Sequence, residues 1–405
     1  MKIVAIGIGQ CGCKIADQFY AINNYSNSFF GRRIEILTDA FAVNADDTDL
    51  SSLKHIPRDM GHRIVIGATR TSGHGVGKVN VEGATIMKQS LPIIIDDILN
   101  SRNFYACDAL MVIASGAGGT GSGGIGPLIK GLRERVEKPV YAIVVLPFGY
   151  EEMPETSYAV VNTATCLKTV DQLADAVFVL DNERFGRGSL SLAQNVELVN
   201  QEMVKNFFDL FCAGEEGRQK FVGSTVVDAG DIKQSLVGIS TIGRGEAALP
   251  IFHRWEKSHY KESTKGAISL VGALSQSINN LCLKVGVEDA RTILALLCAP
   301  QDIINLNAVT EISNNLQQRA PKSEIRIADY PRRSREISIT LVLSALTSID
   351  RTERLYLRAT ELLNKRKELI EEFDSKVKRV EEIRANIPTL CPISQDNHLP
   401  GRVFD

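Results

Sequence analysis

The sequence predicts an α/β fold in which the first half of the chain forms a parallel sheet covered by helices. Apolar runs of strand length alternate with helix-like runs at least five times between residues 2 and 184. Glycine or polar residues follow each apolar run, and the loop richest in glycine is SGAGGTGSGG at residues 115–124. Repeated strand–loop–helix units place their loops at one edge of a parallel sheet, so the pattern predicts a single ligand-binding edge.

The loop at 115–124 has the arrangement that binds phosphate. An apolar run at 109–114 precedes it, and a helix-like run at 125–135 follows it. Residues without a Cβ let backbone N–H groups close around phosphate oxygens, and the helix N-terminus adds its positive dipole end. Thr120 and Ser122 add hydroxyl donors. The loop is not a P-loop, since no Gly-Lys-Ser/Thr follows it, and a flexible linker has no reason to lie between a buried strand and a helix.

Length and composition exclude several classes of protein. A chain of 405 residues has room for two domains, and its 44% hydrophobic and 23% charged residues are ordinary for a soluble globular protein. A net charge of -2 gives no basic surface for nucleic acid, and no apolar run reaches the ~20 residues of a membrane span. The cysteines are scattered, with no CxxC pair, which fits a reducing compartment. We therefore expect a cytoplasmic protein with no nucleic-acid partner and no direct membrane insertion.

The first unit along the chain is a strand at 2–6, a glycine turn at 7–12 and a helix at 14–20. The turn resembles GxGxxG, which is common in dinucleotide-binding folds. Such a site would need an acidic residue ending the second strand, a position that Asp39 or Asp46 could fill. An NAD(P)-dependent oxidoreductase is therefore an open alternative at this point.

The following units repeat this pattern. We expect strands at 34–42, 63–67, 140–146 and 176–180, with helices near 82–101, 125–136 and 157–173. Polar residues at 43–47 end the second strand, where either a ligand site or a solvated turn fits. A third glycine loop occupies 71–77, and its His74 is assigned no catalytic role. Three glycine loops on one edge suit a ligand with several phosphates better than one with a pyrophosphate only.

The second half of the chain has no glycine loops. A long amphipathic helix at 190–212 is a candidate spine between two domains. After it come Asp228 and Asp231, which could lie on one face of a turn, although a helix N-cap at Asp231 explains the pattern equally. Strands at 325–329 and 337–343 indicate an α/β or α+β domain. From 350 the chain reads as one long helix with a narrow apolar stripe, docked on the body or used for a partner or coiled coil.

The loops together resemble those of the tubulin/FtsZ superfamily. SGAGGTGSGG resembles the signature GGGTGTG of the bacterial division proteins and GGGTGSG of tubulins. The segments at 9–12, 43–46 and 73–77 look like the first three loops of that family, 181–183 looks like the sixth, and 228–231 like the seventh, catalytic loop. The resemblance covers about residues 1–350, and the segment at 328–331 looks most like the archaeal CetZ group.

This resemblance implies a Rossmann-like parallel-sheet GTPase domain, a long central helix, a C-terminal α+β domain and a long C-terminal helix. We place these at 1–189, 190–213, 214–349 and 350–387, with a mobile tail at 388–405. The implied activity is that of a cytoskeletal GTPase that polymerises head to tail, with a role in cell shape or division. Its implied partners are further copies of itself and adaptor proteins, and its implied cofactors are GTP or GDP and Mg²⁺.

The resemblance also assigns roles to residues. Asp228 and Asp231 would act on the nucleotide of the neighbouring subunit. Glu151 would reach the ribose, and Asn182 and Asn200 would bind the guanine. The remaining implied nucleotide contacts lie in the glycine loops and the second loop: Gly9, Gln10, Cys11, Gly12, Asn44, Asp46, Gly75, Gly77, Gly118, Gly119, Thr120, Gly121 and Ser122.

Three positions depart from the family pattern. Val226 replaces an Asn two residues before the first catalytic Asp, and Glu155 replaces an Arg four residues after the ribose-binding Glu. Val196 replaces an aromatic residue that often stacks on the base. These changes concern base affinity and hydrolysis rate more than the fold. A filament former that binds GTP without efficient turnover is therefore an alternative to the active GTPase.

Overall fold

A computed structural model of the chain describes residues 1–28, 31–153, 157–218, 222–225, 227–248, 259–332 and 336–385. It divides into two compact units, Met1–Ala359 and Thr360–Asp405, and each is described by itself. Val226, Glu155 and the tail at 388–405 lie outside the described residues. The long C-terminal helix α12, Asp350–Ala385, is continuous across the boundary between the two units.

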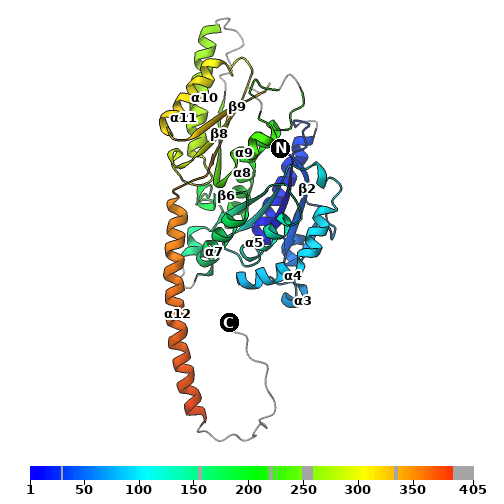
Figure 1. Cartoon of the computed structure of the whole chain (residues 1–405), viewed down its shortest axis with the longest axis vertical. Coiled ribbons are helices and arrows are strands. Elements are labelled where there is room, and N and C mark those ends of the chain that lie inside the picture. Colours follow the sequence, from blue (N-terminus) through cyan, green and yellow to red (C-terminus); the bar gives the residue numbers. More distant parts are fainter. Residues whose placement is uncertain are drawn as a thin grey trace. The chain divides into compact units, whose positions relative to one another are not determined.

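Among the described residues of the first unit, ten strands form one sheet (Figure 1). Their order is β3-β2-β1-β4-β5-β6-β7-β10-β8-β9. Neighbours are parallel from β3 to β7 and between β8 and β9, whereas β10 is antiparallel to both β7 and β8. The bounds are β1 Ile3–Ile8, β2 Leu37–Asn44, β3 Arg63–Val65, β4 Ala109–Ser115, β5 Val140–Leu146, β6 Ala176–Asp181, β7 Gly238–Ala248, β8 Thr292–Ala299, β9 Glu324–Pro331 and β10 Glu336–Ser344.

The order of the first six strands determines where a ligand can bind. From β1 the chain moves outward to β2 and β3, and from β4 it moves in the opposite direction to β5 and β6. Connections on the two sides of such a reversal diverge onto opposite faces, which leaves a crevice at the carboxyl ends of the two central strands. Those strands are β1 and β4, and both are followed by predicted glycine loops.

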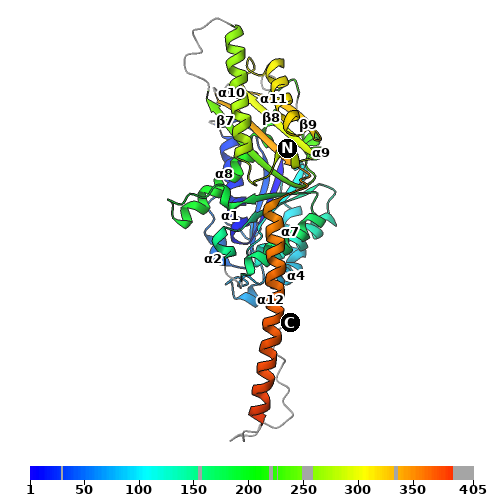
Figure 2. The same cartoon turned by 90° about the vertical axis from the view of Figure 1, so that its left-hand side faces the viewer.

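Helices cover both faces of the parallel part of the sheet. Figure 2 shows α1 and α8 on one side of the strands and α4 and α7 on the other. Alternate strand residues point to opposite faces, so every position in a doubly covered strand is apolar, and β1 and β4 are buried along almost their whole length. The principal helices are α1 Gly9–Asn27, α2 Asp47–Ser51, α4 Asn80–Leu99, α5 Thr120–Arg133, α6 Gly149–Glu152, α7 Tyr158–Leu173, α8 Leu192–Ala213, α9 Ala229–Ser235, α10 His259–Asn279 and α11 Leu306–Arg319.

Helix α8 connects the parallel strands to the later part of the sheet. Its Phe207 ring packs edge-on against Phe19 of α1 and Phe178 of β6, with ring centroids 5.7 and 5.0 Å apart. Its Asp209 is completely buried and pairs with Arg32, before β2, and with Arg244 of β7. Although burial opposes ionisation, the two arginines hold the pKa of Asp209 well below its usual range. One carboxylate thereby connects segments from both halves of the chain.

The second strand differs from its expected bounds. It runs over Leu37–Asn44 instead of 34–42. The N–H groups of Ile36 and Leu37 donate to Oδ1 of Asn23, which starts the strand later. At the other end, pairing of Asn44 with Val65 of β3 carries the strand further. Long-range partners therefore decide both ends, and neither is visible in the local pattern.

None of the helices in the described part of the chain combines the length and the apolar character that crossing a membrane would require.

His62 forms a titratable cluster that joins β2 to the segment before β3. Its Nδ1 lies 2.7 Å from Oδ1 of Asp59 and its Nε2 lies 3.2 Å from Oδ1 of Asp39. The hydrogen bond to Asp39, offset by burial and strengthened by Asp59, raises the pKa of His62 to about 9. The ring also stacks on Phe41, with centroids 5.5 Å apart.

This cluster gives a prediction about pH. A histidine whose folded pKa is raised contributes stability that is complete below its unfolded pKa of about 6.5 and is lost as pH rises through the folded value. Urea unfolding of the wild type and of His62→Gln should therefore differ most at pH 6, and the difference should shrink between pH 6.5 and about 9. A difference that stays constant over that range would contradict the assignment.

Candidate functional site

Three predicted glycine loops meet at the crevice between β1 and β4. A Cβ on Gly9 would lie 3.0 Å from the backbone nitrogen of Gly121, so the first loop touches the start of α5. A Cβ on Gly12 would lie 2.9 Å from the carbonyl carbon of Ile113, because α1 crosses β4 at backbone contact. A Cβ on Gly119 would lie 2.9 Å from Cα of Lys78, at the end of the third loop. Glycine is required at these points because backbone packs on backbone.

The loop after β2 closes the same edge. Asp46 caps α2, its side chain accepting from the N–H of Asp49 at 3.1 Å. The Asp49 carboxylate in turn accepts from Nε2 of Gln10 at 2.7 Å and from Nδ2 of Asn44 at 3.0 Å. The capping turn that the sequence offered as one alternative is therefore present, and its Asn44, Asp46 and Asp49 also line the crevice.

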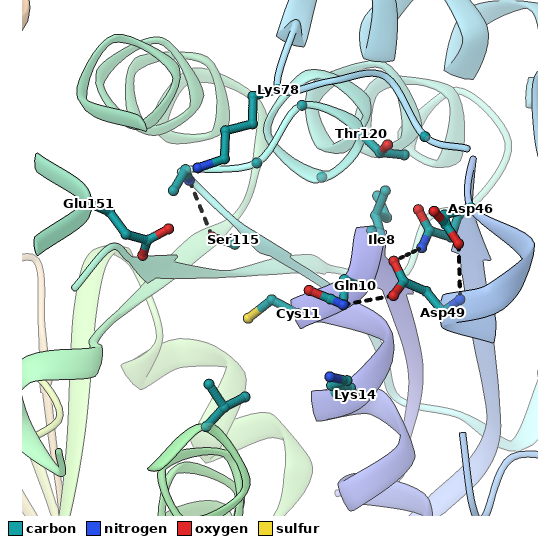
Figure 3. A pocket seen from close by; sticks show the side chains of 18 of the residues that line it. Ile8, Gln10, Cys11, Lys14, Asp46, Asp49, Lys78, Ser115, Thr120 and Glu151 are labelled. Atoms are coloured by element: carbon teal, nitrogen blue, oxygen red, sulfur yellow. Dashed lines mark hydrogen bonds between the residues drawn. The ribbon is translucent and has the colours of Figure 1, made fainter. Parts of the chain in front are cut away.

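The loops enclose a cavity of about 380 Å³ (Figure 3). It lies at the carboxyl ends of the strands, as the reversal of strand order requires. Most of the predicted site residues line it: Gly9, Gln10, Cys11, Asn44, Asp46, Gly75, Gly118, Gly119, Thr120, Gly121, Glu151, Asn182 and Asn200.

Three predicted residues in the loops do not line this cavity. Gly12 lies under the first turn of α1 against β4, and Gly77 holds a left-handed turn with φ 58° in the third loop. Ser122 is buried, and its hydroxyl donates to the carbonyl of Gly118 instead of facing the cavity. Gly12, Gly77 and Ser122 therefore shape the loops, whereas neighbouring loop residues such as Cys11 and Gly121 line the cavity.

One end of the cavity is formed by α8. The Asn200 side chain is 4% exposed, and among the described residues its amide makes no hydrogen bond. Asn200 also lines the cavity, where a ligand or water can reach its amide. Val196, one turn earlier, lines the same wall, and a second cavity of about 240 Å³ shares Lys14, Val196 and Asn200 with the first. The two cavities therefore meet at this end.

The opposite wall comes from the segment after β5. Glu151 accepts from the N–H of Phe148, the N-cap of α6, at 3.1 Å, and its second carboxylate oxygen has no such bond. Phe148 and Tyr150 stack with ring centroids 5.8 Å apart, and both line the cavity. The sequence Pro147–Glu152 therefore supplies aromatic surface that the valine at 196 does not.

Cys11 lines the cavity as a neutral thiol. Burial, with the negative charge of Glu151 added to it, raises the pKa of Cys11 to about 12. A thiolate nucleophile at this position is therefore excluded near neutral pH.

Asp228 and Asp231 lie near the amino-terminal ends of the parallel strands, whereas the cavity lies at their carboxyl ends. They form a reciprocal capping box at the start of α9, with the Asp228 side chain accepting from the N–H of Asp231 at 2.8 Å. The expectation of a cap at Asp231 was wrong, because Asp228 is the N-cap and Asp231 is the third helical residue. Ile232 of α9 and the N-terminus of Met1 both approach Gly214, so α9 lies near the start of β1.

The cavity begins where β1 ends. The six residues of β1 separate the two sites by about 20 Å at ~3.3 Å per residue. Asp228 is exposed and Asp231 is half-buried, and neither lines the cavity. The pair and the glycine loops therefore lie at opposite poles of the parallel strands.

Sequence analysis missed several charged residues at the site. Lys14 and Lys78 line the cavity from α1 and the third loop, and Asp49 lines it from α2. Each follows a predicted loop by a few residues, so the position of the loop was a usable signal. Arg351 gave no local signal, because its partners are more than 150 residues away in sequence.

Arg351, in the first turn of α12, links the segment after β5 to the end of β6. Its guanidinium binds both carboxylate oxygens of Glu152, the Asp181 carboxylate at 3.2 Å and the carbonyl of Pro147 at 3.3 Å. Asp181 precedes Asn182 and caps its turn, and Glu152 follows Glu151. Burial raises the pKa of Asp181, and the arginine partly offsets this shift.

Comparison with known families matches the chain in two consecutive segments. Residues 2–188 match the tubulin/FtsZ family GTPase domain, and residues 189–361 match the C-terminal domain of tubulin-like CetZ. Among curated relatives, CetZ1 of Haloferax volcanii is 29% identical and the match covers 88% of this chain and 91% of that protein. CetZ of Pyrococcus furiosus is 28% identical, with 94% and 95% covered.

Solved CetZ structures are similar to this chain in fold. The GDP-bound monomer of Haloferax volcanii CetZ1 aligns with a TM-score of 0.76 at 28% identity, covering 89% of this chain and 99% of that one. CetZ2 of the same organism, solved as a GTPγS-bound protofilament, aligns with a TM-score of 0.77 at 26% identity, covering 91% and 100%.

The Arg351 cluster leads to a stability prediction. Arg351→Gln leaves two mostly buried carboxylates without their cation, which should cost about 3 kcal/mol in the free energy of unfolding. As a control, Lys54→Gln removes a pair with Glu197 whose side chains are 67% and 52% exposed, and should change stability by less than about 1 kcal/mol. Chemical denaturation would measure both, and equal losses would argue against the cluster.

Proposed function

The chain belongs to the tubulin/FtsZ superfamily, and from this premise we propose that it binds GTP in the cavity and hydrolyses it in head-to-tail filaments. The observation that carries the proposal is the separation of two half-sites. The glycine loops lie at the carboxyl edge of the parallel strands, and the Asp228–Asp231 pair lies at the amino edge. Stacked copies would bring the pair of one subunit over the cavity of the next.

The cavity suits each part of GTP. The N-termini of α1 and α5 point their free N–H groups at the phosphates, as anion sites at helix starts do. Asn200 and Asn182 would bind the guanine, and the second carboxylate oxygen of Glu151 would accept from a ribose hydroxyl. The stacked rings of Phe148 and Tyr150 add an apolar wall.

A magnesium ion fits the same site. Mg²⁺ in nucleotide sites takes one or two carboxylates together with phosphate oxygens, and Asp46 and Asp49 both line the cavity. Asp46 and Asp49 would hold the ion, with phosphate oxygens and waters as its other ligands. The ion would neutralise charge that develops on the phosphate oxygens. Gln10 would hold Asp49 in place through its 2.7 Å hydrogen bond.

Hydrolysis needs a water held in line with the terminal phosphate. A carboxylate that accepts a proton from that water can supply this function, and the exposed Asp228–Asp231 pair of the next subunit is our candidate. One subunit alone then lacks half of the machinery. Turnover depends on assembly, and loss of the terminal phosphate weakens the contact. A cytoskeletal role in cell shape or division, in the cytoplasm and with adaptor proteins as partners, follows from this mode of action.

A filament former without efficient turnover is the second candidate. The observation that favours it is the capping box, because each aspartate already uses one carboxylate oxygen to cap α9. If both carboxylates are held in that geometry within the filament, they would bind the next subunit without orienting a water.

The first prediction of the proposal concerns binding. Asn200→Ala removes an amide that lines the cavity and would bind the base, and should weaken GTP binding by about tenfold to a hundredfold. Its effect on the unliganded fold should be small, because the amide makes no bond among the described residues. Calorimetric titration would measure the affinity. Purified protein that retains a nicotinamide nucleotide instead of a guanine nucleotide would refute the proposal.

The second prediction concerns hydrolysis in trans. Phosphate release per subunit should rise with protein concentration, and Asp231→Ala should abolish this rise while GTP still binds. Asp171→Ala, on the exposed face of α7, is the matched control and should behave as the wild type. Mixing Asp231→Ala with Asn200→Ala subunits should restore part of the release, because each contributes the half-site that the other lacks. Release that is independent of concentration would rule out hydrolysis in trans.

A further inference from the structure

Lys78 stands in a backbone conformation that side chains rarely adopt. The third loop makes its turns with positive φ at Gly73, Gly75 and Gly77, and the next residue continues in the same region with φ 65°. Glycine adopts such angles freely, whereas a lysine there is strained. Strain of this kind persists where the surrounding structure holds it in place, and it clusters at ligand sites.

The position of Lys78 is held from two sides. Its backbone packs on Gly119, where an added Cβ would lie 2.9 Å from both Cα and the carbonyl carbon of Lys78. Asn162 of α7, which is buried, donates from Nδ2 to the carbonyl of Lys78 at 2.8 Å and to the carbonyl of Gly118 at 3.1 Å. A single amide thereby fastens the third loop to the phosphate-binding loop.

The Lys78 side chain lines the cavity. Figure 3 shows it running from the glycine loops toward Ser115 and the wall that carries Glu151. Among the described residues its ammonium makes no hydrogen bond or ion pair. The charged side chains that share the lining are Lys14, Asp46, Asp49 and Glu151.

The two lysines lie at opposite sides of the cavity (Figure 3). Lys14 shares the second cavity with Val196 and Asn200, at the end proposed for the base. Lys78 stands at the glycine loops, where a nucleotide bound with its base against α8 would carry its phosphates. The phosphate farthest from the base is the terminal one, and in this orientation it would lie at the glycine loops beside Lys78.

We propose, on the basis of the GTP site proposed above, that Lys78 binds the terminal phosphate of GTP in its own subunit and makes the site prefer GTP over GDP. An ammonium within hydrogen-bond reach of phosphate oxygens forms a charge-assisted bond, which is stronger than a neutral one. GDP lacks the oxygens that this ammonium would reach. The cation therefore contributes to triphosphate binding much more than to diphosphate binding.

The test compares nucleotide preference in three variants. Lys78→Gly removes the cation and also relieves the strained backbone, Lys78→Arg keeps the charge, and Lys88→Gln removes an exposed cation from α4 outside the cavity. The dissociation constants for GTPγS and GDP are measured in excess Mg²⁺ at protein concentrations too low for assembly.

We expect Lys78→Gly to weaken the binding of GTPγS by about tenfold and the binding of GDP by less than about twofold, since a charge-assisted bond is lost only with the triphosphate. Lys78→Arg and Lys88→Gln should keep the wild-type ratio of the two constants. The melting temperature of unliganded Lys78→Gly should equal or exceed that of the wild type, because glycine tolerates φ 65° without strain.

If Lys78→Gly raised both dissociation constants by the same factor, or changed neither, the inference would be overturned and the GTP site would stand. Normal binding combined with a defect seen only at assembling concentrations would also overturn it, because Lys78 would then contact the next subunit. If the wild type binds neither nucleotide, the proposed function fails and this inference fails with it.

Discussion

The structure depends on backbone-to-backbone contact at the reversal of strand order. Gly12 lets α1 lie directly on the carbonyl of Ile113, and the pair Gly9 and Gly121 lets the loops after β1 and β4 touch. Any Cβ at these points would push α1 away from the sheet and separate two helix starts that must converge on the same anion. The cavity is therefore a consequence of how closely the central elements can pack.

The polarity of a parallel sheet explains why the Asp228–Asp231 pair lies far from the cavity within one copy of the chain. All strands from β3 to β7 run in one direction, so every loop that follows a strand opens at the same edge. The Asp228–Asp231 pair comes after the long run of α8, which carries the chain back to the opposite edge beside Met1. Within one subunit the sheet itself stands between the two groups. Any joint action of the pair and the cavity must involve two copies of the chain.

The parts of the site that could be predicted follow from this polarity. Loops that come directly after buried strands share an edge, so the pattern places Gly118, Thr120 and Asn182 at one edge, where all three line the cavity, while their roles are implied only by the family resemblance. The ends of β2 could not be predicted, because Asn23 and β3 decide them through contacts distant in sequence.

The same limit applies to side chains. Lys78 was missed because a lysine among glycines reads as solvated surface, and only the contact with Gly119 shows that its backbone packs on the glycine loop at 115–124. Arg351 was missed because α12 is predicted as a regular amphipathic helix, and that pattern says nothing about a half-buried arginine in the first turn. Yet Arg351 holds the carbonyl of Pro147 and the carboxylates of Glu152 and Asp181, which flank the segments proposed to read ribose and base. Burying such a cluster costs desolvation that its attractions only partly return, as the raised pKa of Asp181 shows. Its contribution is then positional, because it fixes the start of α12 to the segment after β5 and to the end of β6, between which the nucleoside is proposed to bind.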